Sequence, residues 1–337
     1  MTSSPSRPRL SSLRWLPGAL ISLLLIALIL RSVDLPKTLQ ALRQANFALL
    51  GLAFLLSPLW LGLRAVVWRT LLRNRPAYPD VLLTAGEGYL LNNFLPFRLG
   101  ELGRALLLSR KTSLSVGAIL PTILIERVVD LGFAASFLLA ALPFVFGAAE
   151  AQTFGLLVAL LVLIGLFGLY FLARFHTTAL SLFRHLTRRW PRLQARGAKA
   201  LESFLNGLNV ITELRFFLLF LFWMTLNWLL AWLSYFVMAR AYFPQATPLW
   251  GMFGLGAAAF GGAIPSLPGA LGTFEGAFGG ALTLLGGDPS TALAVALTAR
   301  LYNYFNSLLF GIPGMLRDGE SLTHLYAQLR ALRNLPE

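Results

Sequence analysis

Long apolar runs, separated by short polar or basic stretches, dominate the chain. A helix needs about 20 apolar residues to cross the roughly 30 Å hydrocarbon layer of a bilayer. Runs close to that length lie at residues 15–30, 47–67, 115–146, 154–172, 216–238 and 291–312. Helices satisfy their own backbone hydrogen bonds in lipid. The pattern therefore predicts an all-α fold, a polytopic bundle of membrane helices.

Two further pairs of apolar runs are too short to cross the bilayer. They lie at residues 81–94 and 100–110, and at residues 251–264 and 270–285. Pro96 interrupts the first pair and Pro268 the second, and proline ends a helix because it lacks a backbone N–H. Each pair is predicted to form a re-entrant helical hairpin, the first opening to the cytoplasm and the second to the outer face.

The two hairpins share the frame Leu-Pro-x-x-Leu-Gly. Pro96 precedes Arg127 by 31 residues (127 − 96), and Pro268 precedes Arg300 by 32 residues (300 − 268). The order of the elements is the same in the two halves, and their orientation is opposite. Interrupted apolar segments at matching positions of two halves indicate a transporter site near the midplane of the membrane. The sequence therefore predicts an inverted-topology repeat.

Basic residues indicate which ends of the helices face the cytoplasm. Segment 174–215 holds eight Lys and Arg, and its apolar residues recur at helical spacing. It is predicted to form amphipathic helices on the inner leaflet, joining halves at about 47–173 and 216–312. Arg240 and the connector 31–46 are basic exceptions on the predicted outer side.

This topology gives one transmembrane domain, residues 15–316, in the cell (inner) membrane. Residues 1–14 are predicted to be a disordered cytoplasmic tail, and residues 317–337 a second cytoplasmic tail. The run 15–30 follows several arginines, as in a signal peptide. No small-x-small cleavage site follows Leu30, so a retained first helix is the preferred interpretation.

Composition supports a membrane protein. The chain is 57% hydrophobic and 12% charged, with a mean hydropathy of +0.70, whereas about a quarter of the residues of a soluble protein are charged. A net charge of +14 fits loops that bind anionic lipid headgroups, and no nucleic-acid partner is predicted. With no cysteine and three scattered histidines, neither a metal site nor a cofactor is expected.

Charged residues inside the apolar segments are the candidates for function, because each costs about 2.5–3.5 kcal/mol to insert. They are either structural salt bridges between helices or the lining of a central polar cavity that holds a lipid headgroup. The candidate substrate-binding residues are Asn92, Asn93, Arg98, Glu101, Arg104, Glu126, Arg127, Asp130, Glu275, Arg300 and Asn303.

Arg98, at the first hairpin tip, is the best phosphate candidate, since a planar guanidinium donates two parallel hydrogen bonds and nearby helix N-termini add N–H donors. Its alternative role is to extend to the membrane interface. Asn92 and Asn93 offer amides to headgroup hydroxyls, or are ordinary loop formers. Glu101 is expected to pair with Arg98 or Arg127.

Glycines recur every four residues at Gly272, Gly276 and Gly280. Such spacing is typical of close helix packing, and it permits a homodimer.

Three motifs together resemble a flippase-like membrane family related to the transmembrane part of bacterial lysylphosphatidylglycerol synthetases. They are Asn92-Asn93-Phe94-Leu95-Pro96-x-Arg98-x-Gly100-Glu101 with Arg104-Ala105, Glu126-Arg127-x-x-Asp130, and Pro265-x-x-Pro268-Gly269-x-x-Gly272-x-x-Glu275. The resemblance implies a multi-pass inner-membrane protein with two re-entrant helix pairs. It also implies the movement of an amphiphilic lipid, such as an aminoacylated phospholipid or a polyprenyl-linked glycan, between leaflets. No aminoacyl-transfer domain follows the membrane part, so lipid aminoacylation is not expected.

The main hypothesis is a lipid translocase without enzymatic activity that moves an anionic, aminoacylated or polyprenyl-linked lipid. One alternative is a membrane-embedded transferase that acts on a lipid-linked donor, with Glu101 or Asp130 as general base. Its expected paired aspartates are missing, since the five Asp are widely separated. The other alternative is a non-transporting assembly subunit. No nucleotide-binding loop of the form G-x-x-x-x-G-K-[ST] is present.

Overall fold

Helices make up the regular structure of the described part of the chain, and no strand occurs there. The computed structural model describes residues 16–95, 98–145, 160, 164–165, 167–168, 170–188, 190–208, 212–264 and 266–320. The all-α prediction is confirmed for these residues. The run predicted at 154–172 and the tail at 1–14 lie largely or wholly outside them.

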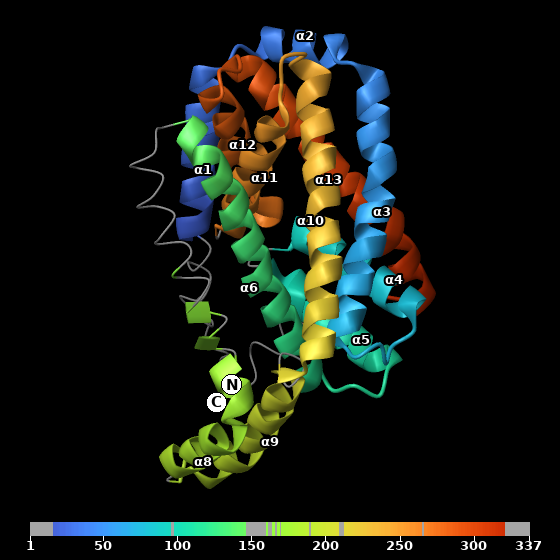
Figure 1. The fold of residues 1–337 in the computed structure, drawn as a ribbon, viewed down its shortest axis with the longest axis vertical. Coiled ribbons are helices and arrows are strands. Elements are labelled where there is room, and N and C mark those ends of the chain that lie inside the picture. The colour runs from blue at the N-terminus through green and yellow to red at the C-terminus, as the bar shows by residue number, and fades with distance from the viewer. Residues whose placement is uncertain are drawn as a thin grey trace, which may run out of the picture.

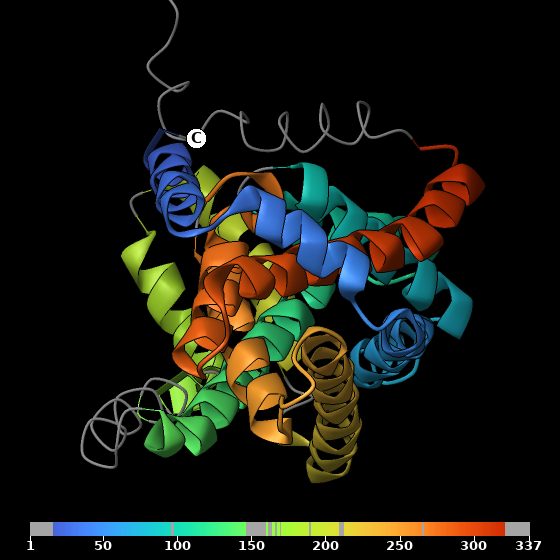
Figure 2. The ribbon, with the colours of Figure 1, turned by 90° about the horizontal axis from the view of Figure 1, so that it is seen from above.

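Three long helices run most of the height of the molecule in Figure 1. They are α3 (Phe47–Leu71), α6 (Val116–Ala141) and α10 (Leu214–Tyr242), and α3 packs along α10. By length and composition, α3 and α10 are long and apolar enough to cross a membrane. The fourth long helix, α13 (Pro289–Asp318), runs obliquely across the bundle (Figure 2).

The two N-terminal helices lie along one side and across one end of the bundle (Figure 1). α1 (Leu16–Ser32) is followed by the short helix α2 (Leu35–Gln44), which lies across the top in Figure 1. Asp34 begins α2, because its side chain accepts a hydrogen bond from the Lys37 amide at 3.2 Å. The connector predicted at 31–46 is thus mostly helical.

The first short helix pair consists of α4 (Tyr78–Phe94) and α5 (Leu99–Lys111), which pack against each other in the lower half of Figure 1. α4 ends at Phe94, and the backbone of the next residue, Leu95, is extended (φ −102°, ψ 141°). Leu95 precedes Pro96, and a residue before proline is pushed away from helical angles by the proline ring. The predicted break therefore falls where the sequence indicated.

The second short pair consists of α11 (Pro248–Ala263) and α12 (Thr273–Leu284), in the upper half of Figure 1. The 3-10 turn η5 (Pro268–Ala270) lies between them. Ile264 precedes Pro265 and is extended for the same reason as Leu95. The two pairs thus enter the bundle from opposite ends.

Glycines allow helices to cross closely at two interfaces, that of α4 with α13 and that of α12 with α1. A Cβ atom on Gly86 of α4 would lie 2.8 Å from the Gly311 nitrogen of α13. The predicted packing of the glycine stripe holds in part, since a Cβ on Gly272 would lie 2.8 Å from the Ser22 carbonyl oxygen of α1. Gly276 also faces α1, whereas a Cβ on Gly280 would meet nothing within 4 Å. The stripe is therefore used inside the chain, by α1.

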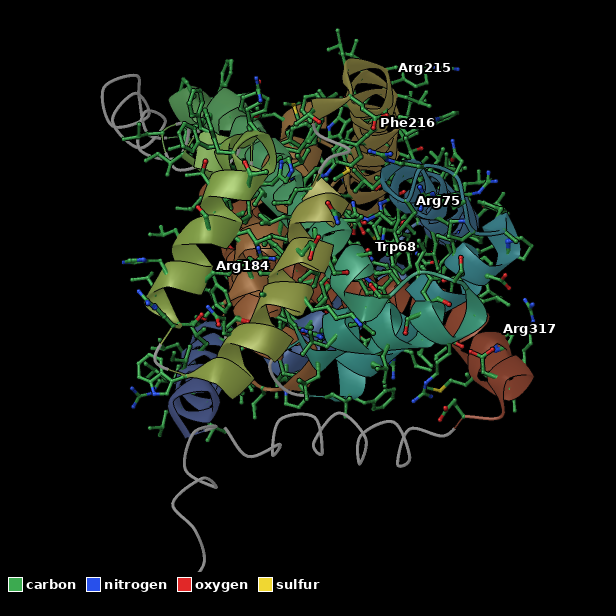
Figure 3. All side chains as sticks on the ribbon, turned by 90° about the horizontal axis from the view of Figure 1, so that it is seen from below. Trp68, Arg75, Arg184, Arg215, Phe216 and Arg317 are labelled. Atoms are coloured by element: carbon green, nitrogen blue, oxygen red, sulfur yellow. The ribbon has the colours of Figure 1, made fainter. Side chains whose placement is uncertain are left out.

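The basic segment forms α8 (His176–Leu186) and α9 (Pro191–Leu208) at the lower end of Figure 1. α9 packs on α6, and α8 has no buried residue, with Leu186 65% exposed. Figure 3 shows Arg184 at the same end as Arg75, Arg215 and Arg317. Basic residues thus gather at one end of the bundle.

α13 extends beyond the boundary at 316 that the sequence suggested. Its last residues are held by ion pairs, Arg317 with Asp80 at 2.9 Å and Asp318 with Lys111 at 2.6 Å. The C-terminal tail therefore begins after α13, because these pairs attach the end of the helix to α4 and α5.

Candidate functional site: a buried ion network and two meeting tips

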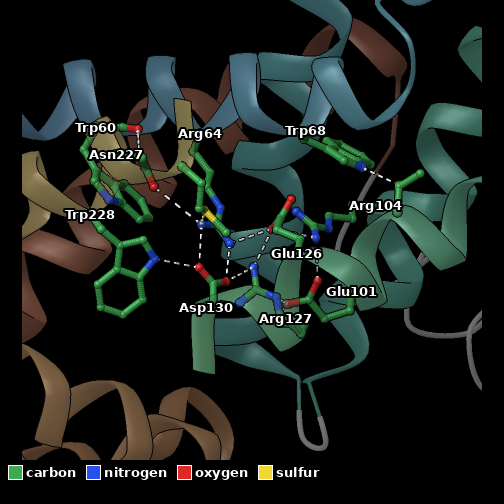
Figure 4. A network of polar contacts seen from close by, with 12 residues as sticks. Trp60, Arg64, Trp68, Glu101, Arg104, Glu126, Arg127, Asp130, Asn227 and Trp228 are labelled. Carbon is green, nitrogen blue, oxygen red and sulfur yellow. Dashed lines mark hydrogen bonds and ion pairs between the residues drawn. The ribbon is translucent and has the colours of Figure 1, made fainter. Parts of the chain in front are cut away.

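Arg64 of α3 lies at the centre of a buried ion network (Figure 4). Its Nη1 donates to Asp130 Oδ1 at 2.8 Å and its Nη2 to Glu126 Oε1 at 2.7 Å. Nη2 also forms an ion pair with Asp130 Oδ2. Arg64 is 2% exposed. Both partners come from α6, so the network joins α3 to α6.

Arg64 is absent from the residues predicted from sequence. It lies near the end of the apolar run 47–67, a position from which arginines usually extend to the interface. The structure continues α3 to Leu71 and buries Arg64 with Leu61 and Trp68 on the same face. That spacing of three and four residues was the available signal, because a charge on the apolar buried face of a helix requires a partner.

Glu126 is the carboxylate around which the arginines gather. Its Oε1 accepts from Arg64 at 2.7 Å, from Arg104 at 3.0 Å and from Arg127 at 2.6 Å. The residue is fully buried, and its Oε2 has no hydrogen-bond partner among the described residues. Three guanidinium groups on one oxygen are stable only if other carboxylates balance their charge.

Glu101 and Asp130 supply that balance at the accessible edge of the network. Glu101 pairs with Arg104 at 3.0 Å and with Arg127 at 3.6 Å. Asp130 pairs with Arg127 at 3.3 Å and accepts from Trp228 Nε1 at 3.0 Å. The network thus holds three arginines and three carboxylates, a net charge of zero (3 − 3). The structure brings the predicted α5 and α6 residues together here, and adds Trp228, which was not predicted.

Neutral side chains complete the wall of the network. Asn227 of α10 accepts from Arg64 Nη1 at 3.4 Å and donates to the Trp60 carbonyl at 2.8 Å. Arg104 lies over the Trp68 ring, 4.6 Å from its centroid. An aromatic face stabilises a desolvated guanidinium. α10, in the second half of the chain, thereby contributes Asn227 and Trp228 to the network, and neither residue is among the predicted candidates.

Arg98 lies outside this ion network, at the start of α5. Its backbone is left-handed (φ 51°, ψ 37°), a conformation that is uncommon for residues other than glycine. Its side chain is exposed, and Nη2 donates to the Gly262 carbonyl oxygen, in the last turn of α11, at 2.5 Å. The tips of the two helix pairs therefore meet through Arg98.

The second tip is held by Arg300 of α13. Its Nε pairs with Glu275, and its Nη1 and Nη2 donate to the carbonyls of Gly269 at 2.5 Å and Ala270 at 3.2 Å. Glu275 Oε2 in turn accepts from the Gly272 amide at 2.9 Å. These bonds satisfy the peptide groups freed by the broken helix. Both residues are thus occupied with each other and with the turn.

The predicted asparagines are also occupied by protein groups. Asn92 Oδ1 accepts from the Gly100 amide at 2.9 Å, and Asn93 Nδ2 donates to Ser307 Oγ at 2.8 Å. Asn303 is half-buried and interacts with Tyr235, apart from the ion network. Asn92 thus caps α5 by binding the Gly100 amide. This backbone N–H, at the helix N-terminus expected to bind phosphate, is therefore already bonded within the chain. Arg98 remains as the charged donor at the tips.

Replacing Arg300 with lysine is expected to loosen the second tip. Lysine keeps the positive charge but has no planar fork, so it cannot hold Glu275 and two carbonyls together. Each lost charge-assisted bond is worth about 1.5–3 kcal/mol. Hydrogen exchange of residues 266–272, measured in detergent, should become faster. Unchanged exchange there, with Arg240→Lys as the comparison, would contradict this role.

No group of three or more acidic or histidine side chains in the described ranges is arranged to hold a metal ion. A family model described as the lysylphosphatidylglycerol synthase TM region matches residues 15–311. Neither a curated protein nor a solved structure matches the chain. The match spans the ion network and both helix pairs.

Proposed function

Because the chain belongs to the family of lysylphosphatidylglycerol synthase transmembrane regions, we propose that it moves a lipid between the leaflets of the cell membrane. The observation that carries the proposal is the contact of two helix-pair tips through Arg98, an accessible cation next to a neutral ion network. A headgroup that displaces the Gly262 carbonyl from Arg98 would separate the tips. Its acyl chains would remain in lipid throughout.

The basic end of the bundle is proposed to face the cytoplasm. Arg75, Arg184, Arg215 and Arg317 lie at that end (Figure 3), and the cytoplasmic side of membrane proteins is rich in Lys and Arg. In this orientation α13 ends in the cytoplasm and α1 begins there. The protein is then a multi-pass membrane protein with both termini inside.

The two helix pairs are proposed to be re-entrant hairpins of an inverted repeat. Glu101 and Glu275 both occupy the third position of the helix that follows the break. Each pairs with an arginine of the next long helix, Arg127 at 3.6 Å and Arg300 respectively. The backbone before each helix has positive φ, 51° at Arg98 and 84° at Gly272. Such a correspondence between pairs entering from opposite ends supports alternating access.

We assign no covalent chemistry to the chain. The transferase alternative needs Glu101 or Asp130 as a general base. Each of these carboxylates pairs with two arginines, and a substrate hydroxyl would have to displace one of them. The same pairing suits the lining of a transport path, because the side chains stay ionised while their charges sum to zero as a headgroup passes. A non-transporting assembly subunit, the other alternative, would not require an accessible cation at the tips.

Arg98→Ala is expected to reduce lipid translocation about tenfold or more, because it removes the guanidinium that joins the two tips. The protein would be reconstituted in liposomes with fluorescent lipids, and arrival in the outer leaflet would be read by chemical quenching. Thermal unfolding should barely change, since Arg98 makes one exposed hydrogen bond.

Arg215→Ala is the matched control, an exposed arginine in the first turn of α10, outside both helix pairs. It should move lipid at the wild-type rate. If wild type moves no tested lipid, the translocase proposal is wrong. If Arg98→Ala moves lipid as fast as Arg215→Ala, the proposed role of Arg98 in translocation is wrong.

A further inference from the structure

The ion network and the two tips together carry one more positive charge than they have negative charges. Within the ion network three arginines balance three carboxylates, and Arg300 balances Glu275. Arg98 has no carboxylate within ion-pair distance among the described residues, and its charged group donates to a carbonyl oxygen. The sum around the tips is therefore one uncompensated positive charge.

That charge is within electrostatic reach of the accessible edge of the network. Arg98 interacts with Arg127, which repels it, and with Glu101 and Asp130, which attract it. The side chains of these three residues are 26%, 18% and 16% exposed, whereas Glu126 is fully buried. A headgroup at Arg98 would therefore meet Arg127, Glu101 and Asp130 first.

The carboxylates at this edge are not available to a positively charged headgroup. Glu101 is shared by Arg104 and Arg127, and Asp130 by Arg64 and Arg127 with Trp228 in addition. An ammonium group would have to displace one of these arginines, and it would lie near Arg98 as a like charge. Headgroups that carry an ammonium are thus disfavoured at the edge.

The Arg98 fork already holds one oxygen, the Gly262 carbonyl at 2.5 Å. A phosphodiester offers two oxygens to such a fork and one full negative charge, where the carbonyl offers one oxygen and a partial charge. A second negative charge would find no further unbalanced cation here. One phosphodiester therefore fits both the geometry and the charge.

We propose that the transported lipid carries a singly charged phosphodiester headgroup without an ammonium group, and that Arg98 selects it. The inference rests on the proposed function and narrows its substrate. It excludes aminoacylated phospholipids, and it keeps lipids of the phosphatidylglycerol type and sugars joined to a polyprenyl chain through one phosphodiester.

The test compares lipids that differ in headgroup charge, using the full chain in phosphatidylcholine liposomes. The fluorescent probes are phosphatidylglycerol (singly negative), phosphatidylcholine (zwitterionic), lysylphosphatidylglycerol (with ammonium groups) and cardiolipin (two phosphodiesters). Wild type should move phosphatidylglycerol about tenfold faster than each of the others, a ratio set by one unpaired charge. An excess of glycerophosphoglycerol, a soluble phosphodiester without acyl chains, should slow this movement without crossing the membrane.

Two variants separate charge selection from general damage. Arg98→Gln should move phosphatidylglycerol and phosphatidylcholine at equal rates, because the extra charge is gone. Arg98→Glu should reverse the order and favour lysylphosphatidylglycerol. Equal thermal unfolding of wild type and both variants shows that the fold is intact.

The outcomes distinguish the two proposals. If wild type moves all four lipids equally, or if the order is the same in Arg98→Glu, charge selection is refuted and translocation stands. If no lipid moves, translocation and the inference that rests on it both fail. If glycerophosphoglycerol itself enters the liposomes, the ligand is a free phosphodiester and the lipid assignment is overturned.

Discussion

Replacing Glu126 with leucine is expected to lower the free energy of unfolding by about 3–5 kcal/mol, the cost of removing one partner from a buried ion pair. Three arginines donate to the one oxygen that this change deletes. Without it Arg64, Arg104 and Arg127 would repel one another in a buried space. Thermal and denaturant unfolding in detergent micelles would measure the loss. Glu126→Gln keeps an acceptor oxygen and should lose less.

Glu213→Gln provides the control for this change. Glu213 pairs with Arg73 at the surface, where the two side chains are 42% and 34% exposed. Exposed pairs contribute about 0–1 kcal/mol, so this variant should unfold like wild type. A Glu126→Leu protein as stable as Glu213→Gln would show that the buried network does not hold α3, α5 and α6 together.

Replacing Gly100 with alanine is expected to separate α4 from α5. A Cβ atom at this position would lie 2.1 Å from the Gly88 carbonyl oxygen and 2.6 Å from Asn92 Oδ1. The first is a backbone atom that cannot rotate away. We expect a cost of about 3 kcal/mol, the upper part of the usual range for overpacking, and a loss of translocation as the Arg98 tip is displaced. Unfolding and liposome assays would measure both effects.

Gly280→Ala is the matched change in α12, because a Cβ there meets nothing within 4 Å. It should be neutral, or stabilising by up to about 1 kcal/mol, since alanine favours helix over glycine. If Gly100→Ala and Gly280→Ala behave alike, α4 and α5 do not pack as closely as described.

Much of the fold follows from local pattern. The ends of α4 and α11 follow from the prolines at 96 and 265, which exclude helical angles for the residue before them. The predicted apolar runs at 47–67 and 216–238 correspond to α3 and α10, longer by a few residues at their ends. Where the chain leaves the apolar layer, a helix can continue through polar residues at little cost. The length of the apolar run therefore underestimates the length of the helix.

Part of the membership of the candidate site was predictable from sequence, but its pairing was not. Glu101, Arg104, Glu126, Arg127 and Asp130 do form one network, as charges in apolar segments must find partners. Glu101 was expected to pair with Arg98 or Arg127, and it pairs with Arg127. Arg98 donates to the Gly262 carbonyl, 164 residues away. Asn92 was expected either to offer its amide to a headgroup or to form part of a loop, and its side chain accepts from the Gly100 amide of α5. Both alternatives satisfy the same hydrogen-bonding groups, so local sequence cannot separate them.

By itself the sequence determined the helices, their breaks, and the fact that buried charges must be balanced, because each of these depends on neighbouring residues or on the cost of charge in an apolar layer. Only the tertiary structure decided that Arg64 joins the network, that α1 covers Gly272 and Gly276, and that Arg98 has no carboxylate partner among the described residues. These outcomes depend on which helices lie side by side. Contacts such as Arg64 with Asp130, 66 residues apart, exist only once the whole bundle has packed.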